Sequence, residues 1–182
     1  MITGVVVLAS GIAQAQGFGN SKVNGRWIDY YFSQVPYQWT LQTNWVRDNE
    51  IDPRAAIVTT WTTSHAAAEI STMFRDWPNS GYVGQNINVD CDIRDINGGY
   101  HVTCTHQHVV YNQHYAEHDC SDCWDTWRER RALACHEHGH GVGLSHVSTS
   151  TSCMRTNTVM HEDYTFSAAD DAAIDGFPLY QP

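Results

Sequence analysis

Residues 134–146 (ACHEHGHGVGLSH) constrain this chain more than any other stretch, because they contain the pattern H-E-x-x-H-x-x-G-x-x-H. His136 and His140 are four residues apart, so on a helix both imidazoles project from one face and can share a metal ion. Glu137 follows the first histidine, which puts its carboxylate beside the metal without binding it. There it can take a proton from a water that the metal activates.

Gly143 and His146 complete the pattern. Glycine at position 143 lets the chain leave the helix in a conformation that a residue with a Cβ resists. The turn brings His146 back as a third nitrogen ligand, and three protein ligands with one open position are typical of a catalytic zinc ion. The alternative is an exposed, histidine-rich helix that binds metal adventitiously, which gives the glutamate and the glycine no reason for their positions.

Met154 lies eight residues after His146, in the sequence Ser-Cys-Met-Arg. With this methionine the chain resembles the metzincin zinc endopeptidases, whose signature is the long histidine motif followed by a methionine turn, and the spacing is most similar to the matrixin branch. The resemblance implies an α+β, metzincin-like zincin fold. This fold has a twisted, mostly parallel sheet with an edge strand, two main helices packed on the sheet, and a small C-terminal subdomain with the Met-turn and a closing helix. Met154 is expected to pack beneath the site rather than to bind the metal.

The resemblance also implies a function. We expect a monomeric, zinc-dependent endopeptidase that hydrolyses peptide bonds in protein or peptide substrates, with one catalytic Zn²⁺ held by His136, His140 and His146. Glu137 is the expected general base. His138 has the wrong helical phase to join the ligands and is expected to face solvent or support a neighbouring loop. The alternative is a secreted binding module that keeps the zinc fold without turnover, although the presence of Glu137 speaks against it.

The length and net charge of the chain further limit the class of protein that it can be. The chain has 182 residues and a net charge of −10, which suits one domain and disfavours a nucleic-acid partner. Residues 4–13 are a short apolar run ending near a small-x-small site, and nothing resembling a membrane span follows. We expect a signal peptide over residues 1–15, a catalytic domain over residues 16–182, and a secreted protein. The basic region expected before such a run is missing, so a truncated start or an ordinary apolar segment are the alternatives.

Periodicity and caps predict the elements around the motif. Strands are expected at 26–32, 55–61 and 82–89, the last as an edge strand, and an amphipathic helix at 36–47 with Tyr37, Leu41 and Trp45 on its apolar face. Residues 65–77 fit a short helix or a loop equally well. The capping box Thr126-x-x-Glu129 predicts that the motif helix begins near Trp127 and runs to about Val142, and a closing helix is expected from Ser167 to Gly176.

Six cysteines, an even number, are compatible with three disulfides in an oxidising compartment. The stretch 90–104 is predicted to be a hairpin around Asn97-Gly98, which favours a Cys91–Cys104 bond. Cys120 and Cys123 form either a small-loop disulfide or bonds to separate cysteines. The metzincin resemblance brings the methionine turn beneath the histidines, which implies a Cys135–Cys153 bond and leaves Cys120 with Cys123.

Two further metal sites have weaker support. Matrixins carry a second, structural zinc, but their aspartate-bearing ligand pattern is absent here, so exposed strand histidines are favoured over a second zinc site. The residues in question share one strand region: His106, His108, Asn112 and His114. Calcium binding is suggested by acidic hairpin residues but lacks the ordered spacing of a calcium loop, so solvated carboxylates are favoured for Asp90, Asp92 and Asp95.

Overall fold

The computed structural model describes residues 22–53, 56–96, 98–118, 126–148, 151–155 and 164–177. The signal peptide expected over residues 1–15 and the Cys120–Cys123 pair lie outside the described residues. No helix in the described ranges is both long and apolar enough to cross a membrane. The strands are β1 (Lys22–Val23), β2 (Trp27–Ser33), β3 (Val58–Trp61), β4 (Ile70–Arg75), β5 (Gly84–Ile96) and β6 (Gly99–Asn112). The α-helices are α2 (Tyr37–Val46), α3 (Trp127–Gly141) and α4 (Ala168–Gly176), with short helical turns η1 (Arg47–Ile51), η2 (His65–Ala67) and η3 (His114–His118).

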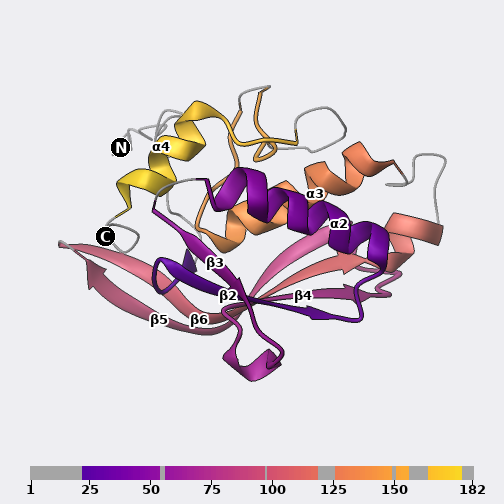
Figure 1. Ribbon diagram of the computed structural model, residues 1–182, viewed down its shortest axis with the longest axis horizontal. Coiled ribbons are helices and arrows are strands. Elements are labelled where there is room, and N and C mark those ends of the chain that lie inside the picture. Colours follow the sequence, from indigo (N-terminus) through magenta and orange to yellow (C-terminus); the bar gives the residue numbers. More distant parts are fainter. Residues whose placement is uncertain are drawn as a thin grey trace, which may run out of the picture.

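The six described strands form one twisted sheet in the order β1-β6-β4-β2-β3, and β5 pairs with β6 (Figure 1). The pairs β1–β6, β6–β4, β4–β2 and β2–β3 are parallel, whereas β5 runs antiparallel to β6. The architecture is therefore a mostly parallel sheet with an antiparallel edge strand, as the sequence led us to expect. A parallel sheet needs crossover connections, and α2 supplies the one between β2 and β3.

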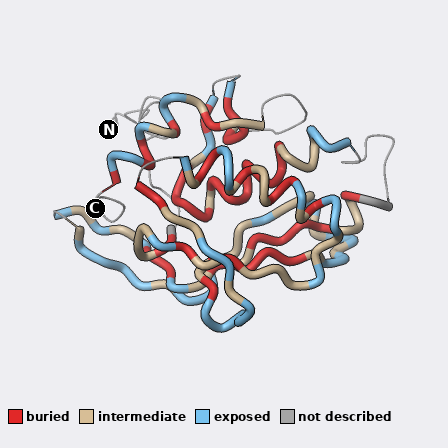
Figure 2. The backbone as a smooth tube through the Cα atoms, in the orientation of Figure 1, coloured by how far each residue is buried: buried red, intermediate tan, exposed pale blue. Residues whose placement is uncertain are grey.

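Helices α2 and α3 lie side by side on one face of the sheet, where they cover the strands (Figure 1). Buried residues concentrate between these helices and the strands, as the red segments of Figure 2 show. The core there combines side chains from the sheet, such as Ile28 and Val109, with Trp39 of α2 and Leu133 of α3. Burying one face of each helix against the sheet holds the motif helix in place.

Strand β4 occupies a central place that the sequence analysis did not assign, because residues 65–77 fitted a short helix or a loop. It lies between β6 and β2, and Ile70 to Met73 are all buried. A strand that is buried at successive positions does not show the alternation of apolar and polar residues that marks an edge strand. Ser71 and Thr72 interrupt its apolar run, so the sequence carried little signal for it.

The buried face of α2 also differs from the expected one. The structure buries Trp39, Gln42, Thr43 and Val46. Tyr37 and Leu41, expected to face the core, are 74% and 44% exposed. Trp39 stacks on Tyr111 with ring centroids 4.7 Å apart, and Thr43 hydrogen-bonds the Tyr111 hydroxyl at 2.7 Å. Aromatic stacking and a buried hydrogen bond therefore hold α2 in an orientation that leaves Tyr37 and Leu41 outward, whereas Trp45 is partly buried against the core.

The hairpin expected over residues 90–104 is longer than predicted. Its second arm continues through residues 105–112, so the second arm of the hairpin and the region of His106 and His108 form one strand, β6. Cys91 lies opposite Cys104 in the β5–β6 register, and the two are joined by a disulfide. The turn reverses between Ile96 and Gly99, and Gly98 has φ +82°, which favours glycine.

The orientation of α2 can be tested with two substitutions on opposite faces of the helix. Trp39→Ala removes a fully buried ring and should lower the free energy of unfolding by about 3–5 kcal/mol. Tyr37→Ala should change it by no more than about 0.5 kcal/mol, because that ring is exposed. Urea unfolding followed by circular dichroism measures both, and a larger loss for Tyr37→Ala would contradict the observed orientation.

Candidate metal centre

Helix α3 begins where the capping box places it. The Thr126 side chain accepts a hydrogen bond from the Glu129 backbone N–H, and the Glu129 carboxylate accepts one from the Thr126 backbone N–H. These bonds satisfy donors that the first turn of a helix leaves without partners. The helix then runs to Gly141 with most of its second half buried, including His136, Glu137 and His138.

The end of α3 is a Schellman turn built on Gly143. Leu144 donates its backbone N–H to the Gly139 carbonyl at 2.8 Å, and Gly143 donates to the His140 carbonyl at 2.9 Å. Gly143 has φ +95°, in the left-handed region that a Cβ disfavours. The chain therefore reverses sharply after the helix, and His146 lies back beside the histidines of α3.

Three imidazoles converge at this end of the helix. The Nε2 atom of His136 lies 3.0 Å from that of His146 and 3.1 Å from that of His140, and the His140–His146 separation is also 3.1 Å. His136 is buried, His140 is partly buried and His146 is exposed, so one side of the cluster is open. The cluster is a candidate site for a metal ion with room for a further ligand.

Backbone carbonyls orient two of the three rings. His136 Nδ1 donates to the Cys153 carbonyl at 2.7 Å, and His140 Nδ1 donates to the Leu144 carbonyl at 2.8 Å. A carbonyl only accepts, so each Nδ1 carries the proton and each Nε2 presents a lone pair to the centre of the cluster. The turn at Gly143 thus contributes twice, because it returns His146 to the cluster and places the Leu144 carbonyl under His140.

This donor set fits zinc. Zinc–imidazole bonds of ~2.0–2.1 Å in tetrahedral geometry place ligand nitrogens about 3.3 Å apart, close to the separations observed here. Burial, together with neighbouring imidazoles, lowers the pKa of His136 to about 3 and that of His140 to about 4. Neutral rings are the form that binds a metal ion, so the cluster is in its ligand state near neutral pH.

Glu137 follows His136 on the same helix, and its side chain lies against strand β5. It is 5% exposed, and burial raises its pKa to about 8, although a hydrogen bond from the backbone of Asn86 acts in the opposite direction. A Cβ built on Gly84 of β5 would lie 3.0 Å from Glu137 Oε1, so the strand and the carboxyl group are in close approach. A cation held by the histidines would favour the charged form of this group.

Met154 packs against α3 at Gly139. It is fully buried, and a Cβ on Gly139 of α3 would overlap its sulfur. The segment around it is held at several points. Val147 donates its backbone N–H to the Met154 carbonyl at 2.9 Å, and Met154 donates its own to Ser152 Oγ at 2.9 Å. Ser152 Oγ in turn donates to Asp170, so α4 is tied to the same turn.

The Cys135–Cys153 disulfide links α3 to the segment that carries Met154. Each cysteine is adjacent to a residue of the site, since Cys135 precedes His136 and Cys153 precedes Met154. The Cys153 carbonyl is also the acceptor for His136 Nδ1. The disulfide therefore holds the acceptor that orients the first histidine.

His138 corrects one expectation, because it faces neither solvent nor a loop. Its ring is fully buried between α3 and the sheet, 5.4 Å from the Tyr30 ring, with Thr72 Oγ1 at 3.4 Å from Nε2. Burial lowers its pKa to about 3, so it is a neutral core residue. Tyr164, the next tyrosine after Met154, packs against Trp45 and Trp127.

Comparisons with known proteins add one finding. No family model matches the sequence, and no curated protein matches it either. The fold is similar to a solved structure of myroilysin, with a TM-score of 0.50 and 13% sequence identity over 86% of this chain and 94% of that chain. At this identity the likeness concerns the fold alone. It agrees with the sheet and helices described above and does not indicate the matrixin branch in particular.

The close contact between α3 and Met154 generates a stability test. Gly139→Ala places a methyl group onto the Met154 sulfur and should lower the free energy of unfolding by about 1–3 kcal/mol, together with the affinity for zinc. Gly176→Ala is the matched control, because no described heavy atom lies within 4 Å of its Cβ position. Thermal unfolding measures both, and equal Tm values for the two variants would contradict the contact.

The two described disulfides allow a second comparison. Cys135→Ala/Cys153→Ala and Cys91→Ala/Cys104→Ala open loops of 18 and 13 residues, so each double variant should lose roughly 3 kcal/mol of stability. Only the first pair touches a histidine acceptor, so only it should also weaken zinc binding, as measured by competition with a chromophoric chelator. Equal zinc affinity in both variants would show that the disulfide does not support the site.

Proposed function

We propose that this protein is a secreted, zinc-dependent endopeptidase of the metzincin type. The observation that carries the proposal is the convergence of His136, His140 and His146 within 3.1 Å, with an acidic side chain on the same helix and an open side. The Schellman turn at Gly143 and the buried Met154 are the features that a metzincin requires around such a cluster. The spacing from His146 to Met154 favours the matrixin branch.

A zinc ion held by the three histidines would lower the pKa of a water molecule and polarise the scissile carbonyl of a peptide. The residues of the chain orient the metal ligands and support the helix that carries them. His136 and His140 hold their Nε2 atoms in place through Cys153 and Leu144, so neither of these two rings needs to reorient when the metal binds. The sulfur of Met154 supports the helix from below.

Glu137 is the proposed general base and acid. In the charged form it accepts the proton of the attacking water, and it then passes that proton to the nitrogen of the leaving amine. Its position suits both steps, because burial next to β5 removes competing water and the Asn86 backbone fixes the carboxyl group. A carboxyl group whose pKa burial keeps near neutrality can exchange a proton in either direction.

Strand β5 is the proposed substrate platform. It pairs with β6 along one side, and no described strand pairs with its other side. At Gly84 and Asn86 this strand passes directly beside Glu137. An extended peptide that paired with this edge would present its backbone to the metal and the base, and its recognition would rest on main-chain hydrogen bonds.

The proposed setting is extracellular, with residues 16–182 as the catalytic domain. Two disulfides join described cysteines, and such bonds persist in oxidising compartments. The negative net charge fits a protein or peptide substrate better than a nucleic acid.

The function is tested by cleavage of casein with the zinc-loaded full chain. Glu137→Gln keeps the shape of the side chain but cannot accept a proton, so kcat/KM should fall roughly 10²–10⁴-fold while the zinc content stays the same. His140→Ala should lose both the zinc of this site and the cleavage. Removing zinc with a chelator should abolish cleavage, and adding zinc back should restore it.

Two results would contradict the proposal. Cleavage by Glu137→Gln at the wild-type rate would remove Glu137 from the mechanism. A wild-type chain that binds zinc through His140 but cleaves no unfolded protein would favour the zinc-binding module without turnover.

A further inference from the structure

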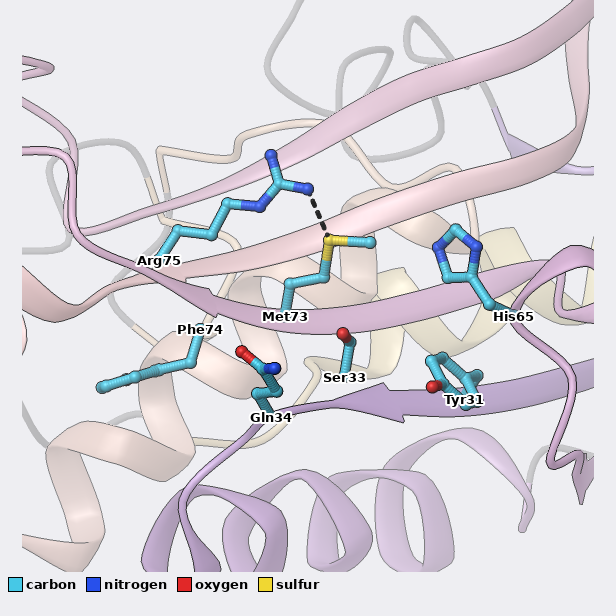
Figure 3. A pocket seen from close by; sticks show the side chains of 7 residues that line it. All are labelled: Tyr31, Ser33, Gln34, His65, Met73, Phe74 and Arg75. Carbon is cyan, nitrogen blue, oxygen red and sulfur yellow. Dashed lines mark hydrogen bonds between the residues drawn. The ribbon is translucent and has the colours of Figure 1, made fainter.

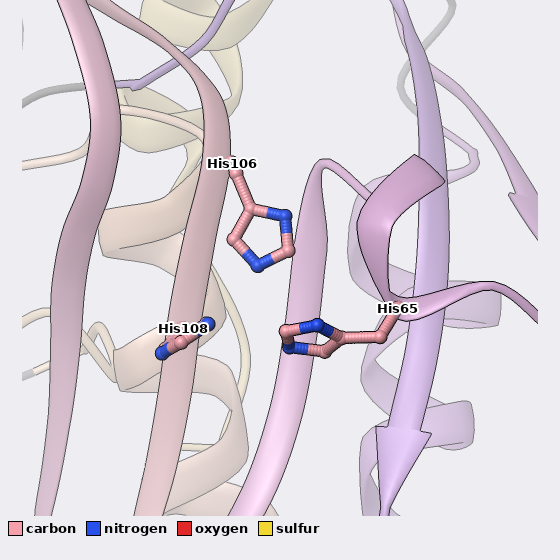
Figure 4. Close-up of side chains that lie close together, drawn as sticks. All are labelled: His65, His106 and His108. Carbon is pink, nitrogen blue, oxygen red and sulfur yellow. The ribbon is translucent and has the colours of Figure 1, made fainter.

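A second group of three histidines lies away from the candidate metal centre. His106 and His108 come from β6, and His65 comes from η2 in the connection between β3 and β4 (Figure 4). One ring nitrogen from each residue lies within 4.8 Å of the other two. The ring centroids are 4.9–5.4 Å apart, against 4.6–4.9 Å for the three histidines at the end of α3.

The two groups lie on opposite faces of the sheet. Gln107, between the two strand histidines, faces α3, since a Cβ on Gly141 would lie 3.6 Å from its Oε1 atom. Side chains alternate along a strand, so His106 and His108 project from the face that the helices leave uncovered. The second group therefore cannot exchange ligands with the first.

The second group contains buried nitrogen atoms without partners. Nε2 of His106 and Nε2 of His108 are inaccessible to solvent and have no hydrogen-bond partner among the described residues. Ser71 lies opposite His108 in the β4–β6 register, and its hydroxyl is also buried without a hydrogen-bond partner among the described residues. Burying polar atoms without partners costs free energy, so a ligand that paired with these atoms would be favoured here.

We infer that His65, His106 and His108 form a second binding site for a divalent transition-metal ion of the zinc type. Imidazole nitrogens are ligands that zinc prefers. The three nitrogens lie within 4.8 Å of one another and would have to approach to about 3.3 Å, to which rotation of the exposed His65 side chain can contribute. A bound cation would satisfy nitrogens that now have no partner.

Charge and protonation agree with this assignment. Burial lowers the pKa of His106, and burial together with neighbouring imidazoles lowers that of His108 to about 4, so both rings are neutral ligands near pH 7. Asp90 lies opposite His106 in the β5–β6 register and adds negative charge, whereas Arg75 adds positive charge near His108. The Arg75 guanidinium is directed to the Met73 sulfur at 3.0 Å.

The site opens onto a pocket of about 390 Å³, in which His65 and Tyr31 lie at one end and Arg75 at the other (Figure 3). His65 belongs to both the pocket and the histidine group, so an ion there could take a further ligand from solvent.

The ligand set of this second site differs from the set that was considered from the sequence. Asn112 is buried and binds the 77–82 loop, and His114 lies in η3 near Asp76. The aspartate-bearing set of matrixins has no counterpart in three imidazoles.

The second site can be tested by counting the zinc ions that each chain binds. The metal-free full chain is equilibrated with Zn²⁺ alone, freed of unbound ion by gel filtration and analysed for zinc by mass spectrometry. Wild type and the control His101→Ala, which changes another histidine of β6, should each bind two zinc ions. His65→Ala and His140→Ala should each bind one, because each loses a different site. His65 lies in an exposed turn, so this substitution spares the core, and circular dichroism verifies the fold.

A thermal measurement gives an independent readout. In the His140→Ala background, zinc at ~100-fold above the dissociation constant should raise Tm by roughly 5–10 °C through the second site alone. The rise should vanish in His140→Ala/His65→Ala. Equal zinc content in wild type and His65→Ala, or an equal Tm rise in the presence and absence of His65, would overturn the inference. Failure of the catalytic proposal would leave these counts unchanged, because they do not depend on cleavage.

Discussion

The whole structure depends on holding three imidazole nitrogens within 3.1 Å of one another at the end of one helix. Near neutral pH they must stay neutral, and their lone pairs must point to a common centre. Burial meets the first condition, and carbonyls that accept from Nδ1 meet the second for His136 and His140. Each carbonyl belongs to a segment that other interactions hold in place, so the site extends well beyond its ligands.

Three features of the structure support the histidine cluster, and they act on the same few residues. Gly143 allows the Schellman turn that returns His146 and places the Leu144 carbonyl. The Cys135–Cys153 disulfide fixes the acceptor of His136. Met154 fills the space under Gly139 that any side chain would occupy. The end of α3 thus explains why Gly143, Gly139 and Met154 stand where they do in the sequence.

The site was predictable to the extent that it is local. The capping box, the histidine spacing and Gly143 act within some twenty residues. The helix, its end and the approach of the three rings could therefore be predicted from the sequence. Interactions between distant segments were not predictable in this way. The pairing of α2 with Tyr111 decides which face of that helix is buried, and no periodicity within α2 reports it. His65 joins His106 and His108 only because β4 returns the chain to β6, and β4 was itself missed.

Anomalous diffraction at the zinc edge from crystals of the zinc-loaded full chain tests the central claim most directly. The account predicts a zinc peak about 2.0–2.1 Å from Nε2 of His136, His140 and His146, with Glu137 outside the ligand set. A folded, zinc-loaded chain without a peak at these three nitrogens would contradict it.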